Sequence, residues 1–135
     1  MPDSAVREHL RRRLGEHLTE LGYSWVRSSR GTLPVPEIVR VSPVRRRIAY
    51  GETVLRSDLG RRRCHERLLC FSQRRTRRRS SILFFIGVAA GDEVALEALL
   101  QELDIRSRTR GGHVHVVPIT PSAARRRPPN RETGK

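Results

Sequence analysis

The sequence predicts an α/β protein in which a mixed β-sheet is flanked by helices. Apolar residues recur every three or four positions over residues 4–21 and again over residues 92–103, which is typical of helices with one buried face. Residues 81–89 form an almost unbroken apolar run, as expected for a strand covered on both faces. A chain of 135 residues has the length of a single domain.

The two helices of the first half have clear patterns. The helix over residues 4–21 is expected to take Ser4 as its N-cap and to end at Gly22, because these residue types favour the two ends of a helix. A second helix is predicted over residues 61–73, where apolar side chains fall at helical spacing. Between these helices the pattern changes to that of strands.

A β-hairpin is predicted between the two helices. Residues 37–41 alternate, residues 47–54 form a second extended run, and Ser42-Pro43 is a turn signal. The complete order is therefore helix, β-hairpin, helix, strand, helix and strand, a mixed-sheet sandwich with βαβ crossovers in its second half.

The last strand and the tail follow. Residues 113–119 are predicted to form an edge strand, because Pro118 cannot donate a hydrogen bond to a neighbouring strand. Residues 122–135 combine proline with arginine and have no apolar periodicity, so we expect a disordered basic tail after a domain over residues 1–121.

Positive charge is the strongest feature of the composition. The chain has 28 Lys and Arg against 14 Asp and Glu, a formal net charge of +14, and every basic residue except Lys135 is an arginine. Such a surplus attracts polyanions, of which nucleic acid is the commonest. Replacement of lysine by arginine on this scale is also what a genome-wide compositional bias produces, so charge alone leaves both interpretations open.

Composition also bears on location. A mean hydropathy of −0.55 and apolar runs too short to cross a bilayer exclude an integral membrane protein. No charged-then-apolar leader opens the sequence, and two cysteines do not make a disulfide scaffold. We therefore expect a cytoplasmic protein that does not associate with membranes.

Two acidic residues on the predicted hairpin carry a resemblance. Pro36-Glu37-Ile38 on its first strand and Gly51-Glu52-Thr53-Val54 on its second, within this order of elements, resemble the PD-(D/E)XK restriction-endonuclease-like superfamily over residues 4–119. The resemblance implies a restriction-endonuclease-like sandwich and Mg²⁺-dependent phosphodiester hydrolysis, with Glu37 and Glu52 as catalytic metal ligands. Glu37 stands where the family usually has Asp.

The chemistry explains why two carboxylates on adjacent strands matter. Mg²⁺ takes oxygen ligands, polarises a phosphate and lowers the pKa of an attacking water. We expect Glu37 and Glu52 to point to the same sheet face. The alternative is that they are solvent-facing strand carboxylates paired with Arg47 or Arg45.

The family's lysine is missing. Its position is taken by Val54, which neither donates a hydrogen bond nor carries charge. Alternation along the strand places Arg56 on the same face, so Arg56 is the candidate substitute in a relocated catalytic site, although it cannot act as a base. The site is therefore either relocated or inactive.

The helix after the hairpin adds a candidate phosphate-binding surface. Its basic residues are Arg62, Arg63, Arg67 and Arg74, and guanidinium forks match phosphate geometry without reading bases. The alternative is a solvated helix face.

Three functions are compatible with these features. The first is a nuclease-like nucleic-acid-binding domain, with DNA as the expected partner and hydrolysis weak or lost. The second is an active metal-dependent endonuclease with a relocated site. The third is a protein-interaction domain with a genome-driven arginine surplus.

Overall fold

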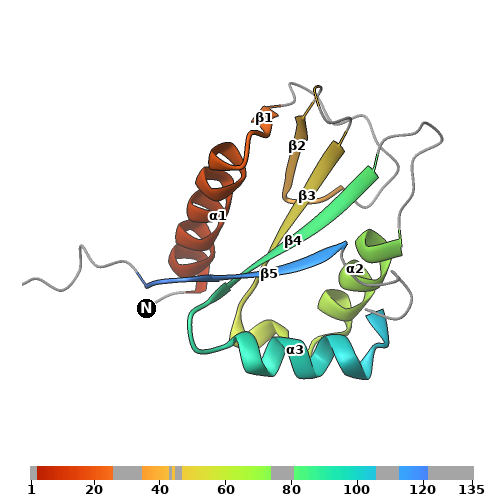
Figure 1. Cartoon of the computed structure of the whole chain (residues 1–135). Helices are drawn as coiled ribbons and strands as arrows, with labels where there is room; N and C mark the ends of the chain where they lie inside the picture. The colour runs from red at the N-terminus through yellow and green to blue at the C-terminus, as the bar shows by residue number, and fades with distance from the viewer. Residues whose placement is uncertain are drawn as a thin grey trace, which may run out of the picture.

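A mixed β-sheet with the strand order β1-β2-β3-β4-β5 forms the centre of the molecule, and helices cover both of its faces (Figure 1). The computed structural model describes residues 3–25, 35–42, 44, 47–73, 81–105 and 113–121, with the backbone alone at Trp25 and Ser81. The elements are α1 (Asp3–Glu20), β1 (Ser24–Trp25), β2 (Ile38–Ser42), β3 (Arg47–Val54), the short 3₁₀ helix η1 (Arg56–Asp58), α2 (Arg62–Gln73), β4 (Ser81–Ala89), α3 (Glu93–Glu102) and β5 (Val114–Ile119).

Pairing changes direction within the sheet. Strands β1, β2 and β3 pair antiparallel, with Ser42 opposite Arg47 at the hairpin. Strands β3, β4 and β5 pair parallel, so each of the two parallel connections passes through a helix, first α2 and then α3. The predicted α/β class, the order of the predicted elements and the edge position of the last strand are confirmed, and the structure adds strand β1 and the short helix η1.

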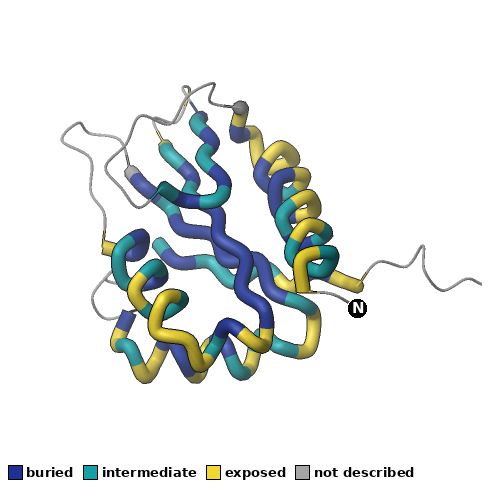
Figure 2. The backbone as a smooth tube through the Cα atoms, turned by 180° about the vertical axis from the view of Figure 1, so that it is seen from behind, coloured by how far each residue is buried: buried dark blue, intermediate teal, exposed yellow. Residues whose placement is uncertain are grey.

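The sheet separates two apolar cores (Figure 2). On one face α1 buries Leu10, Leu14 and Leu18 against the sheet, following the spacing of a single helical stripe. On the other face α2 and α3 pack over β3, β4 and β5, and the buried side chains include Phe71 of α2 and Leu96 of α3. Strand β4 contributes to both cores, as its apolar run predicted.

Helix α1 packs on the sheet over two strand residues that have no side chain. A Cβ atom at Gly51 would lie 3.0 Å from Cβ of Ile38 and 3.2 Å from Cδ2 of Leu14. A Cβ atom at Gly87 would lie 3.1 Å from Cδ1 of Ile119 and 3.3 Å from the same Leu14 atom. Leu14 therefore rests over two glycines of neighbouring strands.

Several boundaries differ from those predicted. Helix α1 begins at Asp3, so Ser4 lies inside the helix and the N-cap assignment was wrong. Gly22 has φ of +97°, the left-handed conformation expected after a helix end. Strand β2 begins at Ile38, so Glu37 precedes it. Among the described residues, no helix is long and apolar enough to cross a membrane.

Some predictions fall outside the described residues. They are the tail over residues 122–135, the turn residue Pro43 and the candidate phosphate-binding residue Arg74.

Candidate functional site

A cleft of about 460 Å³ opens where β3 continues past the start of β2. The last cross-strand pair of the hairpin at this end is Ile38 with Gly51, so the residues of β3 after Gly51 have no partner in β2. The cleft lies between the start of α1, the end of β3, η1 and the start of α2, and is within the size range of ligand sites. Its lining residues are Arg7, Glu37, Glu52, Thr53, Val54, Asp58, Arg61, Arg63, Cys64, Arg67 and Leu68.

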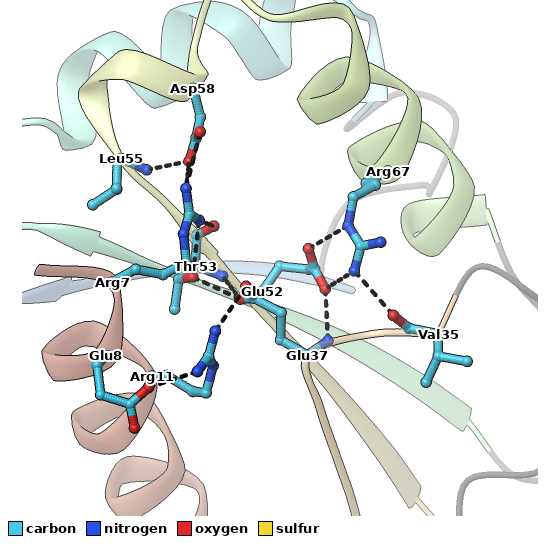
Figure 3. Close-up of polar contacts among 10 residues, drawn as sticks. All are labelled: Arg7, Glu8, Arg11, Val35, Glu37, Glu52, Thr53, Leu55, Asp58 and Arg67. Atoms are coloured by element: carbon cyan, nitrogen blue, oxygen red, sulfur yellow. Dashed lines mark hydrogen bonds and ion pairs between the residues drawn. The ribbon is translucent and has the colours of Figure 1, made fainter. Parts of the chain in front are cut away.

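Glu52 is the most buried acidic residue of the cleft, with 5% of its surface exposed. Arg67 of α2 donates two hydrogen bonds to it, from Nε to Oε1 at 2.9 Å and from Nη2 to Oε2 at 2.7 Å (Figure 3). The backbone N–H of Glu37 donates a third, 2.7 Å long, to Oε2. Burial raises the pKa of Glu52 above its ordinary value of 4.5, while the hydrogen bond from Arg67 opposes that shift.

The Glu37 carboxylate points toward α1, whereas the Glu52 carboxylate points toward α2. Its Oε1 accepts hydrogen bonds from the backbone N–H and the hydroxyl of Thr53, both 2.6 Å long. Its Oε2 lies 3.5 Å from Nη2 of Arg11, which belongs to α1. Thus Glu37 is held by donors from the α1 side and Glu52 by a donor from the α2 side (Figure 3).

A third carboxylate closes the cleft beyond the end of β3. Arg7 of α1 donates from Nη2 to both oxygens of Asp58, at 3.0 and 2.8 Å, and from Nη1 to the carbonyl oxygen of Thr53 at 3.1 Å. The backbone N–H of Leu55 also donates to Asp58 at 2.9 Å. Arg7 therefore fastens the first turns of α1 to the end of β3 and to η1.

These contacts bear on whether the residues fit Mg²⁺. The carboxylates of Glu37 and Glu52 do not converge on one point, and the guanidinium of Arg67 occupies the open side of the Glu52 carboxylate. Over the described residues, no three Asp, Glu, His or Cys side chains are grouped to hold a metal ion. As these side chains lie, they do not form a magnesium site. The expectation that both carboxylates point to one face was wrong, because Thr53 and Arg11 draw Glu37 toward α1.

Neither Val54, which takes the family's lysine position, nor Arg56, its candidate substitute, supplies a charge to the cleft. Val54 is 2% exposed and packs in the core beneath α2. Strand β3 ends at Val54, so Arg56 lies in η1 and does not continue the alternation. Arg56 pairs with Asp92 at 3.2 Å, its side chain is 76% exposed, and it does not line the cleft. The strand-based placement of Arg56 beside Glu52 was wrong.

The predicted phosphate-binding arginines of α2 have different surroundings. Arg62 is exposed and pairs with Glu66, one turn further along the helix. Arg67 is committed to Glu52, to the carbonyl oxygen of Val35 at 2.9 Å and to the ring of Phe71. Arg63 is exposed at the cleft, together with Arg61. Within the described part of the chain, neither Arg61 nor Arg63 has an ion-pair partner.

A second hollow adjoins the cleft. It has a volume of about 630 Å³ and is lined by Arg63, Glu66, Arg67 and Cys70. Because Arg63 and Arg67 border both hollows, the two hollows adjoin at α2, and the second is called here the groove along α2.

The cysteine in the cleft has a raised pKa. Burial raises the pKa of the Cys64 thiol to about 11, and the nearby carboxylates of Asp58 and Glu52 add to this shift. The thiol is therefore protonated at neutral pH and adds no negative charge.

Sequence reasoning did not identify the partners of the acidic residues. Glu52 is buried and pairs with Arg67, so the alternative of a solvent-facing carboxylate paired with Arg47 was also wrong. A signal existed for Arg67, which lies three residues after Cys64 and four before Phe71 and so shares the face of α2 that packs on the sheet. Nothing comparable in the sequence indicated Arg7 or Asp58, which meet only in the folded chain.

We compared the chain with protein-family models, with curated proteins and with solved structures, and none of these comparisons gave a match. What the structure defines is a three-layer α/β protein with a charged cleft at the end of β3.

Proposed function

We propose that the chain is a nuclease-like nucleic-acid-binding domain in which metal-dependent phosphodiester hydrolysis is weak or lost. Its relation to the restriction-endonuclease-like superfamily is part of the proposal. The order helix, hairpin, helix, strand, and the position of the cleft at the open end of the hairpin, support that relation.

The observation that carries the proposal is the pairing of each of the three described cleft carboxylates with an arginine. Arg67 holds Glu52, Arg11 approaches Glu37 and Arg7 holds Asp58. A metal ion at Glu52 would have to displace a buried bidentate ion pair, which is costly because the freed charge loses its partner. The carboxylates thus position arginines. Because they are already paired, the cleft is suited to an anion.

Charge at the edge of the cleft supports binding of a polyanion. Arg61 and Arg63 are exposed there, and Arg62 lies beside them on the first turn of α2. Guanidinium groups contact phosphates independently of sequence, and the groove along α2 extends the contact beyond a single phosphate.

Binding to a short DNA duplex, measured by fluorescence anisotropy over a range of salt concentrations, tests the proposal. The logarithm of the affinity is expected to fall linearly with the logarithm of the salt concentration, with about 0.9 in slope per phosphate contact. Arg62→Gln combined with Arg63→Gln removes up to two contacts and should flatten the slope. Removal of residues 122–135 tests separately the contribution of the arginine-rich tail.

The matched control is Arg12→Gln combined with Arg13→Gln, which removes the same charge from the exposed side of α1. Equal slopes for the two double variants would show that the cleft side of α2 is not the binding face. Absence of binding to both DNA and RNA at low salt would overturn the proposal and favour a protein-interaction domain.

A further inference from the structure

The charges of the cleft do not cancel. Its three described carboxylates contact Arg67, Arg11 and Arg7, and Arg11 also pairs with Glu8 at 2.7 Å. Arg61 and Arg63 also line the cleft and are exposed. Among the described residues, neither Arg61 nor Arg63 has an ion-pair partner, so both guanidinium groups are open to an anion.

The lining of the cleft strengthens the effect of the positive charge on Arg61 and Arg63. Val54 and Leu68 supply apolar walls, and a wall of low polarity screens charge less than water does. The thiol of Cys64 is neutral and is a hydrogen-bond donor. No acidic residue occupies the first turn of α2, where one would favour the helix dipole, and two arginines stand there instead. Positive charge in the first turn lowers the stability of the helix, and a bound anion would offset this loss.

The amount of charge distinguishes two kinds of phosphate. A phosphodiester within a strand carries one negative charge, whereas a phosphate monoester carries about −1.5 to −2 at neutral pH and offers three acceptor oxygens. Two guanidinium groups that line one cleft, neither with an ion-pair partner among the described residues, match the charge of the monoester. The cleft is bordered by residues of α1, β3, η1 and α2, which suits the end of a strand, whereas the described residues that line the groove all belong to α2.

We propose that the cleft binds a terminal phosphate monoester of a nucleic-acid strand, with Arg61 and Arg63 as the residues that receive it. This inference rests on the proposed function and deepens it, because it assigns strand ends to the cleft and the adjoining strand to the groove along α2. Arg67 and Arg7 are positioning residues here, since Nε and Nη2 of Arg67 donate to Glu52 and the carbonyl oxygen of Val35, and both Nη atoms of Arg7 donate to Asp58 and Thr53.

The experiment uses the full chain and a DNA hairpin that has one open end, prepared with a 5′-phosphate, with a 3′-phosphate or with hydroxyl groups only. Anisotropy titrations at one salt concentration give the three affinities. We expect one of the phosphorylated forms to bind about tenfold more tightly than the hydroxyl form, the effect of one additional charge-assisted interaction. Which form it is identifies the strand end that enters the cleft.

Arg61→Gln combined with Arg63→Gln should reduce that preference to less than about twofold, whereas the control double variant at Arg12 and Arg13 should keep it. Thermal unfolding checks that both variants are folded. If the three hairpins bind the natural protein equally well, or if the preference survives in the Arg61 and Arg63 variant, the inference is wrong while the proposed function stands. If no hairpin binds at all, the proposed function fails and the inference fails with it.

Discussion

Arg67 and Glu52 join α2 to β3 through a bidentate ion pair whose side chains are 22% and 6% exposed. The same guanidinium donates to the carbonyl oxygen of Val35, so it also fixes the segment that leads into β2. A single side chain therefore holds together three segments at the cleft, namely α2, β3 and the residues before β2. This explains why the position is an arginine, because a lysine could not form the same planar contacts.

Loss of this pair should be costly. Arg67→Gln is expected to lower the free energy of unfolding by about 3 kcal/mol, because the Glu52 carboxylate would stay buried without a matching charge. The double variant with Glu52→Gln should lose less than the sum of the single changes. Urea denaturation of the natural protein, the two single variants and the double variant measures the coupling between Arg67 and Glu52.

The control is Arg13→Gln, which breaks an exposed pair with Glu16 whose side chains are 56% and 50% exposed. That change should cost less than about 0.5 kcal/mol. Equal losses at Arg67 and Arg13 would contradict the structural role of the buried pair.

The pKa of Glu52 predicts a dependence of stability on pH. Because burial raises the pKa of the folded carboxyl above its ordinary value of 4.5, the folded state binds the proton more tightly than the unfolded state. Glu52 therefore contributes most stability below pH 4.5, and this contribution is lost as pH rises through the raised pKa. The difference in unfolding free energy between the natural protein and Glu52→Gln should show this slope.

Arg67→Gln removes the hydrogen bond that lowers the pKa of Glu52, so it should make that slope steeper. Denaturation curves recorded between acidic and neutral pH provide the comparison. If the difference in unfolding free energy between the natural protein and Glu52→Gln stays constant over that pH range, the raised pKa of Glu52 is refuted.

Hydrolysis should be absent or very slow with Mg²⁺ or Mn²⁺, and a lysine at position 54 should not restore it. Loss of one preorganised electrostatic group typically costs about 10²–10³ in rate. Val54→Lys supplies the charge but leaves Glu37 held by Thr53 and Arg11, and Glu52 held by Arg67. It should also lower the free energy of unfolding by more than about 2 kcal/mol, because Val54 packs in the core.

Cleavage of a labelled duplex measures this outcome, with Val54→Ile as the apolar control. Cleavage by Val54→Lys that disappears on adding Glu52→Gln would show that the two carboxylates can still hold a metal ion. Activity in the natural protein that Arg56→Ala abolishes would support a relocated site.

The contact between Arg7 and Asp58 predicts a local effect. Asp58→Ala removes the acceptor of Arg7 and of the Leu55 N–H, and should lower the free energy of unfolding by about 2 kcal/mol. Hydrogen exchange should become faster in the first turns of α1, which Arg7 fastens to η1. If exchange there is unchanged, Arg7 does not anchor the helix.

Local pattern was sufficient to predict the elements but not the cleft. Helix α1, strand β3 and strand β4 follow from apolar spacing, and β3 and β4 have the predicted bounds. The carboxylate pairs depend on side chains that meet across layers, such as Arg7 with Asp58. Period-two alternation failed at Glu37 and Arg56 because both lie just outside a strand, where it no longer applies.

The two glycines beneath Leu14 link the apolar interior to the charged cleft. Arg7 and Arg11 reach Asp58 and Glu37 from a helix whose height above the sheet is set by Leu14 resting on Gly51 and Gly87. One added methyl group at either glycine would push α1 away from the sheet. Affinity for an anion could therefore be tuned from a solvent-inaccessible position that no ligand touches, by changing how far these two arginines extend over the cleft.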